Sequence, residues 1–178
     1  DASLSAERKQ DIARSAFQSM ALVTLDLFWF SLFTRKRIEK YVDYDDSIHH
    51  FTDKDGAYVG IAAHLGNWEI IGLMASLHGD PLFSVATPLK NRFADAVLNR
   101  LRSSTGQTIQ ARKGALRELI KILKGGGNVG LLVDQNTRVE RGGIFVEFFG
   151  LPVPVTKAPA FLASRTGAAV GVGYCIPQ

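Results

Sequence analysis

The sequence predicts an α/β protein with a mixed, mostly parallel sheet that is covered by helices and preceded by N-terminal helices. From residue 57 onward, apolar runs of strand length alternate with stretches of helical length. The runs are continuously apolar, as in AYVGIAA (57–63), which is typical of strands buried on both faces. With 46% hydrophobic and 21% charged residues, the composition is that of a globular protein.

The expected elements follow one another without a linker or an internal repeat. The expected strands are 57–63, 82–87, 107–110, 128–133, 144–149 and 168–175. The expected helices are 67–78, 91–104, 114–124 and 156–166, with a polar loop at 134–143. We therefore expect a single domain over 1–178, with a helical part at 1–50 and a catalytic α/β core at 57–178. In such sheets the sites gather at the carboxyl ends of the strands, where His64, Arg112 and Asp134 fall.

Residues 4–40 read as helix, and the stretch MALVTLDLFWFSLF (20–33) carries a single charge, Asp26. This stretch is shorter than the roughly 18 apolar residues expected of a membrane-spanning helix. The basic cluster RKRIEK (35–40) follows it. Basic residues beside an apolar helix with Trp and Phe fit docking on an anionic bilayer surface. A core helix with a solvated end remains the alternative.

Positive charge is concentrated in one part of the chain. Residues 90–124 hold nine basic side chains against two acidic ones, a net charge of +7 where the whole chain has +4. We interpret this stretch as a face for an anionic partner, with a solvated helix face as the alternative. Phe93 is the only aromatic residue in it, and nucleic-acid binding usually needs several.

The stretch AAHLGNWE (62–69) contains the strongest candidates for catalysis. Glu69 lies five positions after His64, so the two would not share one face of a helix. We expect His64 at the end of the preceding strand, Asn67 as the cap of the next helix, and Glu69 in its first turn. The prediction is that the His64 and Glu69 side chains lie within hydrogen-bond reach or one water apart. The alternative is an ordinary strand-end histidine followed by an acid favoured by the helix dipole.

A second strand, VGLLV (129–133), leads directly into Asp134 and Gln135. A polar pair at a buried strand end is expected to be hydrogen-bonded or functional. The segment FVEFFGLPVP (145–154) that follows could line a slot for a hydrocarbon chain, or pack on the core as an edge strand.

The single cysteine, Cys175, excludes an internal disulfide, and no group of Cys and His has zinc-site spacing, so no metal site is expected. His49 and His50 are adjacent and are expected in a surface loop. No G-x-S-x-G nucleophile motif is present. The chain starts without Met and stops soon after a strand-like run, so we expect segments before and after it.

Five blocks in order, HLGNWE, RSSTG, ARKG, GLLVDQN and FFGLPVPVTKAPAFLASRTGAAV, resemble the bacterial lipid A biosynthesis acyltransferases of the lysophospholipid acyltransferase superfamily. The resemblance covers about residues 57–176 and implies a glycerolipid acyltransferase-like fold. It implies catalytic roles for His64 and Glu69. It also implies that Arg102, Asp134 and Gln135 belong to the substrate cleft, to which we add Asn67, Arg112 and Lys113 as candidate substrate-binding residues. Related actinobacterial enzymes acylate mannosylated phosphatidylinositol and have similar blocks, which leaves the acceptor open.

The expected activity is transfer of a fatty acyl chain from a thioester, on acyl carrier protein or CoA, to a hydroxyl of a lipid. Histidine, with an unperturbed pKa near 6.5, suits a base for the alcohol. Basic residues such as Arg102, Arg112 and Lys113 would hold phosphates. No cofactor beyond the acyl donor is expected, and the expected location is the cytoplasmic face of the bacterial inner membrane.

Two other functions stay open at this point. One is a non-catalytic protein that binds an anionic lipid, or a nucleic acid, through the basic stretch. The other is a hydrolase that uses the same His and Glu to activate water.

Overall fold

A computed structural model of the chain describes residues 4–49, 56–77, 82–111 and 114–177. Five strands form one sheet in the order β3-β2-β4-β1-β7, and every neighbouring pair is parallel. These strands are β1 (Tyr58–Ala62), β2 (Leu82–Ala86), β3 (Thr108–Ala111), β4 (Asn128–Leu132) and β7 (Ala169–Val172). The predicted fold class is confirmed. All five strands lie within one or two residues of the predicted ranges, except that β7 ends three residues early.

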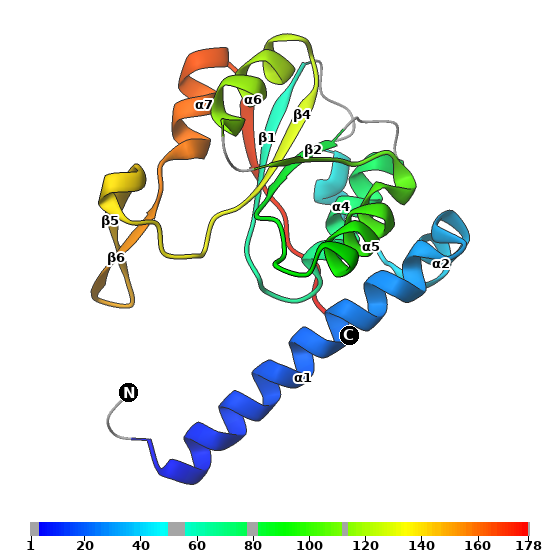
Figure 1. The fold of residues 1–178 in the computed structure, drawn as a ribbon, viewed down its shortest axis with the longest axis vertical. Helices are drawn as coiled ribbons and strands as arrows, with labels where there is room; N and C mark the ends of the chain where they lie inside the picture. Colours follow the sequence, from blue (N-terminus) through cyan, green and yellow to red (C-terminus); the bar gives the residue numbers. More distant parts are fainter. Residues whose placement is uncertain (1–3, 50–55, 78–81, 112–113, 178) are drawn as a thin grey trace.

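Helices cover both faces of this sheet. They are α1 (Ala6–Ser31), α2 (Thr34–Tyr41), α4 (Trp68–Leu77), α5 (Arg92–Arg102), α6 (Ala115–Lys124) and α7 (Ala158–Thr166), with short 3-10 helices at Asp46–Ile48, Ser103–Thr105 and Val139–Arg141. In Figure 1, α4 and α5 lie on one side of the sheet and α6 and α7 on the other. Strand order explains this, because the connections through α4 and α5 step toward β3 whereas those through α6 and α7 step back toward β7. Right-handed crossovers in opposite directions put their helices on opposite faces.

Each face has its own apolar core. On one face, α6 and α7 pack on the strands through Val59, Ala115, Leu119, Leu123, Val129 and Leu162. On the other, the second half of α1 packs with α2 and α4 through Leu27, Phe30, Ile38, Ile70 and Leu73. Burying one such aliphatic or aromatic side chain contributes about 1.5–3 kcal/mol. The N-terminal helices are therefore part of the folded body and not a detached tail.

The predicted helix over 4–40 is in fact two helices. The chain leaves α1 after Ser31, and Phe33 has a left-handed backbone with φ of 58° before α2 begins. This turn brings Ile38 of α2 back against Leu27 and Phe30. The first half of α1 is exposed and projects from the body (Figure 1). Among the described residues, no helix combines the length and the apolar character needed to cross a membrane.

A separate two-stranded hairpin, β5 (Gly143–Phe148) and β6 (Leu151–Thr156), projects beyond the sheet (Figure 1). The sequence did not predict β6, because Pro152 and Pro154 argue against a strand in a sheet interior. Prolines are tolerated here because β6 pairs with a strand on one side only. The proline nitrogens, which have no N–H to donate, can face the unpaired side. The side chains of Phe145 and Phe148 are largely exposed, so the hairpin does not pack as the expected edge strand of the core.

The basic stretch 90–124 does not form one face. Its helices α5 and α6 cover opposite faces of the sheet (Figure 1), so the cations they carry are divided between two sides of the molecule. The described cations of this stretch therefore do not form the single face that the sequence predicted, and Arg112 and Lys113 lie outside the described residues. Strand order determines which face a helix covers, and the linear charge pattern carries no information about that order.

Candidate active site

The carboxyl ends of β1 and β4 form the place in the sheet where a ligand is most readily accommodated. These two strands are neighbours, and the chain leaves β1 toward α4 on one face but leaves β4 toward the elements on the other face. Loops that depart to opposite sides open a crevice between adjacent strand ends. His64 follows β1 and Asp134 follows β4, so both lie at this crevice.

The register of the two strands brings His64 and Asp134 together. Ala62 pairs with Leu132, and the backbone N–H of Val133 still donates to the carbonyl of Ala62 at 3.1 Å. Continuing the same register by two residues puts His64 opposite Asp134. The carboxylate of Asp134 binds both the ring and the backbone of His64, with Nδ1 to Oδ1 at 2.8 Å and backbone N to Oδ2 at 2.9 Å.

These hydrogen bonds determine the tautomer of the neutral imidazole and favour the ionised form of Asp134. With Nδ1 donating to Asp134, the lone pair of a neutral ring is on Nε2, the nitrogen that remains available. Burial by itself raises the pKa of Asp134, but the hydrogen bonds from the His64 ring and backbone and the charge of the ring outweigh burial and lower it. The indole of Trp68 packs edge-on against the ring, with centroids 4.8 Å apart. The ring is thus held by a carboxylate and by an aromatic neighbour.

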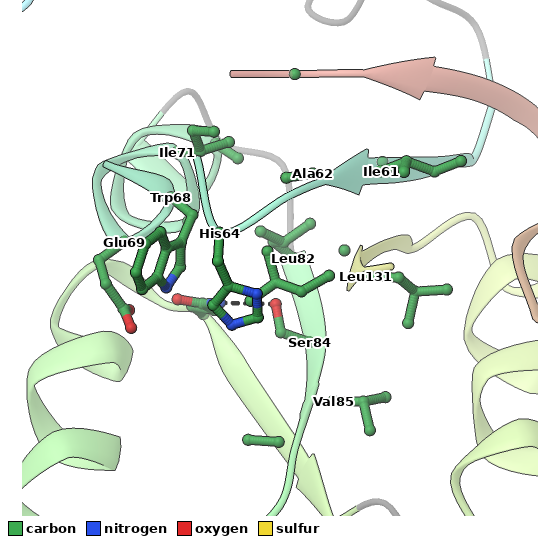
Figure 2. Close-up of a pocket in the computed structure, with 18 of the residues that line it drawn as sticks. Ile61, Ala62, His64, Trp68, Glu69, Ile71, Leu82, Ser84, Val85 and Leu131 are labelled. Carbon is green, nitrogen blue, oxygen red and sulfur yellow. Dashed lines mark hydrogen bonds between the residues drawn. The ribbon is translucent and has the colours of Figure 1, made fainter. Parts of the chain in front are cut away.

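Glu69 has a different partner from the one the sequence predicted. Its carboxylate accepts two hydrogen bonds from Arg102, from Nη2 to Oε1 at 2.6 Å and from Nε to Oε2 at 3.0 Å. Within the described residues it makes no hydrogen bond to His64, and in Figure 2 the indole of Trp68 lies between the two side chains. The direct hydrogen bond between His64 and Glu69, one of the two arrangements predicted, is therefore not formed, and the arrangement with one water between them stays a prediction. A carboxylate in the first turn of α4 points toward the end of α5, whereas the strand end opposite His64 is that of β4.

The ion pair with Glu69 affects both the pKa and the orientation of the Arg102 guanidinium. The hydrogen bonds from the guanidinium to Glu69 raise the pKa of Arg102 despite its partial burial. Two parallel N–H to oxygen contacts hold the guanidinium in one orientation at the cavity. Nη1 takes no part in these two contacts.

Asn67 caps α4, as predicted, but it does not line the cavity. Its Oδ1 accepts from the backbone N–H of Ile70 at 3.2 Å, its Nδ2 donates to Asp26 at 2.8 Å, and the residue is only 4% exposed. A side chain whose groups are already paired inside the protein has none to offer a substrate. The structure therefore gives Asn67 a structural role in place of the predicted substrate-binding one.

A cavity of about 1290 Å³ opens beside His64, and Trp68, Glu69, Arg102 and Gln135 also line it. Its walls are largely apolar; Figure 2 labels Ile61, Ala62, Ile71, Leu82, Val85 and Leu131 among the lining residues. None of the residues 143–155 lines it, so the predicted hydrocarbon slot in the FVEFFGLPVP segment is not part of this cavity. Strand and helix residues of the core provide the apolar walls instead.

The remaining candidates divide into described and undescribed residues. Arg112 and Lys113, like His50, lie outside the described residues, and His49 is exposed. Burial and the charge of Asp26 raise the pKa of the Cys175 thiol, which favours the unreactive protonated form. Over residues 4–49, 56–77, 82–111 and 114–177, no three Cys, His, Asp or Glu side chains form a group that could hold a metal ion.

The chain resembles known proteins along nearly its whole length. The family model described as bacterial lipid A biosynthesis acyltransferase matches residues 2–176. The chain belongs to this family. It is also 25% identical, over 174 residues, to a phosphatidylinositol mannoside acyltransferase of Mycolicibacterium smegmatis (strain ATCC 700084 / mc(2)155). That alignment covers 96% of this chain and 57% of the relative, so the chain spans little more than half of the relative's length.

Two contacts of the His64 region could not be predicted from the sequence. Trp68 was visible in the HLGNWE block, but nothing in its spacing indicated packing on the histidine ring. Asp26 was visible as a lone acid in an apolar helix, which is a recognisable signal for a buried polar partner. The identity of that partner, Asn67, depends on tertiary packing of α1 against α4.

Proposed function

We propose that this protein is an O-acyltransferase that moves a fatty acyl chain from a thioester donor, on acyl carrier protein or CoA, to a hydroxyl of a lipid acceptor. The observation that carries the proposal is the His64–Asp134 pair at the crevice between β1 and β4, beside a largely apolar cavity. Membership in a family of lipid acyltransferases supports the reaction class. The acceptor is a glycolipid or phospholipid, such as a lipid A precursor or a mannosylated phosphatidylinositol.

In the proposed reaction, Nε2 of His64 takes the proton of the acceptor hydroxyl while its oxygen attacks the thioester carbonyl. The C–O bond forms, the C–S bond breaks, and the imidazolium returns the proton to the departing thiolate. Asp134 holds the ring in the tautomer that this requires and stabilises the imidazolium, as the carboxylate of a catalytic triad does. The acceptor itself is the nucleophile, so no acyl-enzyme forms.

Arg102 and Gln135 are proposed to position substrate. Arg102 lines the cavity with one guanidinium nitrogen not used by Glu69, which suits contact with a phosphate of the donor or of the lipid headgroup. In this account Glu69 acts through Arg102 and orients it. Gln135 is exposed at the same strand end as Asp134 and adds a neutral hydrogen-bonding group.

We further propose that the protein works at a membrane surface. The side of α1 opposite its buried residues exposes Leu22, Leu25 and Trp29, and Leu32 follows directly after the helix; each of the four is at least 40% exposed. The guanidinium of Arg37 lies 4.1 Å from the Trp29 ring centroid, and α2 carries three further cations. An apolar helix face edged by aromatics and cations suits an anionic bilayer. Leu22→Ser combined with Leu25→Ser should weaken co-sedimentation with phosphatidylglycerol-containing vesicles.

The decisive assay supplies a labelled acyl thioester with and without a lipid hydroxyl acceptor. Transfer that depends on the acceptor, with intersecting initial-rate patterns and no acylated protein from donor alone, supports the proposal. Release of free fatty acid without transfer would instead indicate a hydrolase, and binding without turnover a lipid-binding protein. Cys175→Ala should leave the rate unchanged, whereas a mass shift of one acyl chain on the protein would rule out direct transfer.

A further inference from the structure

Asp26 is the one charge in the apolar stretch 20–33, and it lies on the body side of α1, half-buried. Its Oδ2 accepts a hydrogen bond from Nδ2 of Asn67 at 2.8 Å. Burying a carboxylate is unfavourable unless it is paired, so its place in the helix is explained by this partner. Asp26 is not among the residues that line the cavity.

Asn67 is the point where three parts of the chain meet. Besides Asp26 of α1, its backbone N–H donates to the carbonyl of Cys175 at 2.6 Å, and its Oδ1 caps α4 through Ile70. Removing Asp26 would leave a buried amide donor of Asn67 unpaired. An unsatisfied buried donor is costly, and the surrounding backbone moves to relieve it.

The loop from His64 to Asn67 is fixed at both ends by these contacts. At its start, the backbone and ring of His64 bind Asp134. At its end, Asn67 binds Asp26 and Cys175. Gly66, between them, approaches the Cys175 carbonyl so closely that a Cβ would lie 1.9 Å from its oxygen. The loop therefore has little freedom while all of these contacts persist.

We propose that Asp26 is a positioning residue of the active site: by holding Asn67 it fixes the loop that carries His64, and so keeps Nε2 directed at the cavity. This inference rests on the proposed role of His64 as the base. It assigns α1 a part in catalysis through its inner face, in addition to the contribution of that face to the core.

The test uses substitutions that separate the hydrogen bond from the charge. Asp26→Asn keeps an acceptor for Asn67 and should retain kcat within about threefold, whereas Asp26→Leu removes it and should lower kcat about 10- to 100-fold with KM nearly unchanged. Asn67→Asp sets two carboxylates against each other and should be similarly impaired. Combining Asn67→Asp with Asp26→Asn exchanges the two partners and should restore kcat to within about fivefold of wild type. Asp11→Leu makes the same chemical change on the exposed half of α1 and should have no effect.

Rates are referred to folded protein, measured by circular dichroism well below the melting temperature. A second readout, independent of activity, is the ¹⁵N spectrum of the His64 ring, assigned among the four histidines with His64→Ala. The ring signals should shift in Asp26→Leu and stay in place in Asp26→Asn and Asp11→Leu. Unchanged ring signals and unchanged kcat in folded Asp26→Leu would overturn the proposal, as would failure of the folded double variant to recover. If wild type shows no transfer, the ring signals still test the positioning, and only the proposed function fails.

Discussion

The carboxylate of Asp134 binds His64 twice, at Nδ1 over 2.8 Å and at the backbone N–H over 2.9 Å, and the two residues are 70 positions apart in the chain. Adjacent parallel strands in fixed register produce this contact, since Val59 also pairs with Val129 at the same spacing. A carboxylate that binds both ring and backbone controls where the ring lies as well as which nitrogen carries the proton. The register of β1 and β4 therefore determines how His64 and Asp134 lie relative to each other.

The first prediction concerns stability against pH. Because the pKa of Asp134 is lowered in the folded protein, the folded state binds that proton more weakly than the unfolded state. Its contribution to stability is thus present above the ordinary aspartate pKa of about 3.9 and is lost as pH falls through the lowered folded pKa. The melting temperatures of wild type and Asp134→Asn should differ most above about pH 5 and converge as the pH falls through the lowered pKa of Asp134.

Glu140→Gln removes an exposed carboxylate from the same loop and serves as the control. It should change the melting temperature little at any pH. If the melting temperature of wild type exceeds that of Asp134→Asn by the same amount from neutral to acid pH, the ionised carboxylate is not the source of the difference.

The second prediction concerns the Glu69–Arg102 pair, whose side chains are 11% and 24% exposed. Removing either partner leaves a partly buried charge, so Glu69→Gln should lower the free energy of unfolding by about 1–3 kcal/mol. A double-mutant cycle with Arg102→Gln should give a coupling energy of the same order. The exposed Glu118–Lys121 pair is the matched control and should couple by less than about 0.5 kcal/mol. Equal coupling in the two cycles would contradict this ranking.

The third prediction concerns Gly66, which has φ of 62° and stands against the Cys175 carbonyl. Gly66→Ala adds both a left-handed backbone penalty and a clash with backbone, and should lower the free energy of unfolding by about 2 kcal/mol or more. Gly106→Ala is the comparison, because Gly106 also has positive φ but faces open space. It should cost only about 1 kcal/mol. Similar unfolding curves for the two variants would show that the contact with Cys175 is unimportant.

Much of the fold was predictable from the sequence because each strand of the sheet is a continuous apolar run bounded by turn residues. His64 and Asp134 could be assigned to strand ends for the same reason. The hairpin strand β6 was not predicted, because its prolines are compatible only with an edge position, and tertiary structure determines which strand lies at an edge. The break between α1 and α2 at Phe33 was not predicted, because a phenylalanine in left-handed conformation has no sequence signature.

The partners within the site could not be predicted, because partner choice depends on strand order and helix packing. Glu69 is five positions from His64 in the chain, yet its carboxylate is hydrogen-bonded to Arg102 of α5. Asp134 is distant in the chain but follows the neighbouring strand. The division of residues 90–124 between two faces has the same origin. After β3 the chain steps back across the sheet, and the charge pattern gives no sign of this change.

The most direct test of the account compares Asp134→Asn with Glu69→Gln in one acyl-transfer assay, with donor and acceptor varied. We predict that Asp134→Asn lowers kcat by about 10²- to 10⁴-fold, because the ring loses its tautomer partner, with KM nearly unchanged. Glu69→Gln should mainly raise KM, since it acts through Arg102, and should keep kcat within about tenfold. The opposite pattern, with kcat lost in Glu69→Gln and retained in Asp134→Asn, would contradict the claim that Asp134 is the partner of the catalytic histidine.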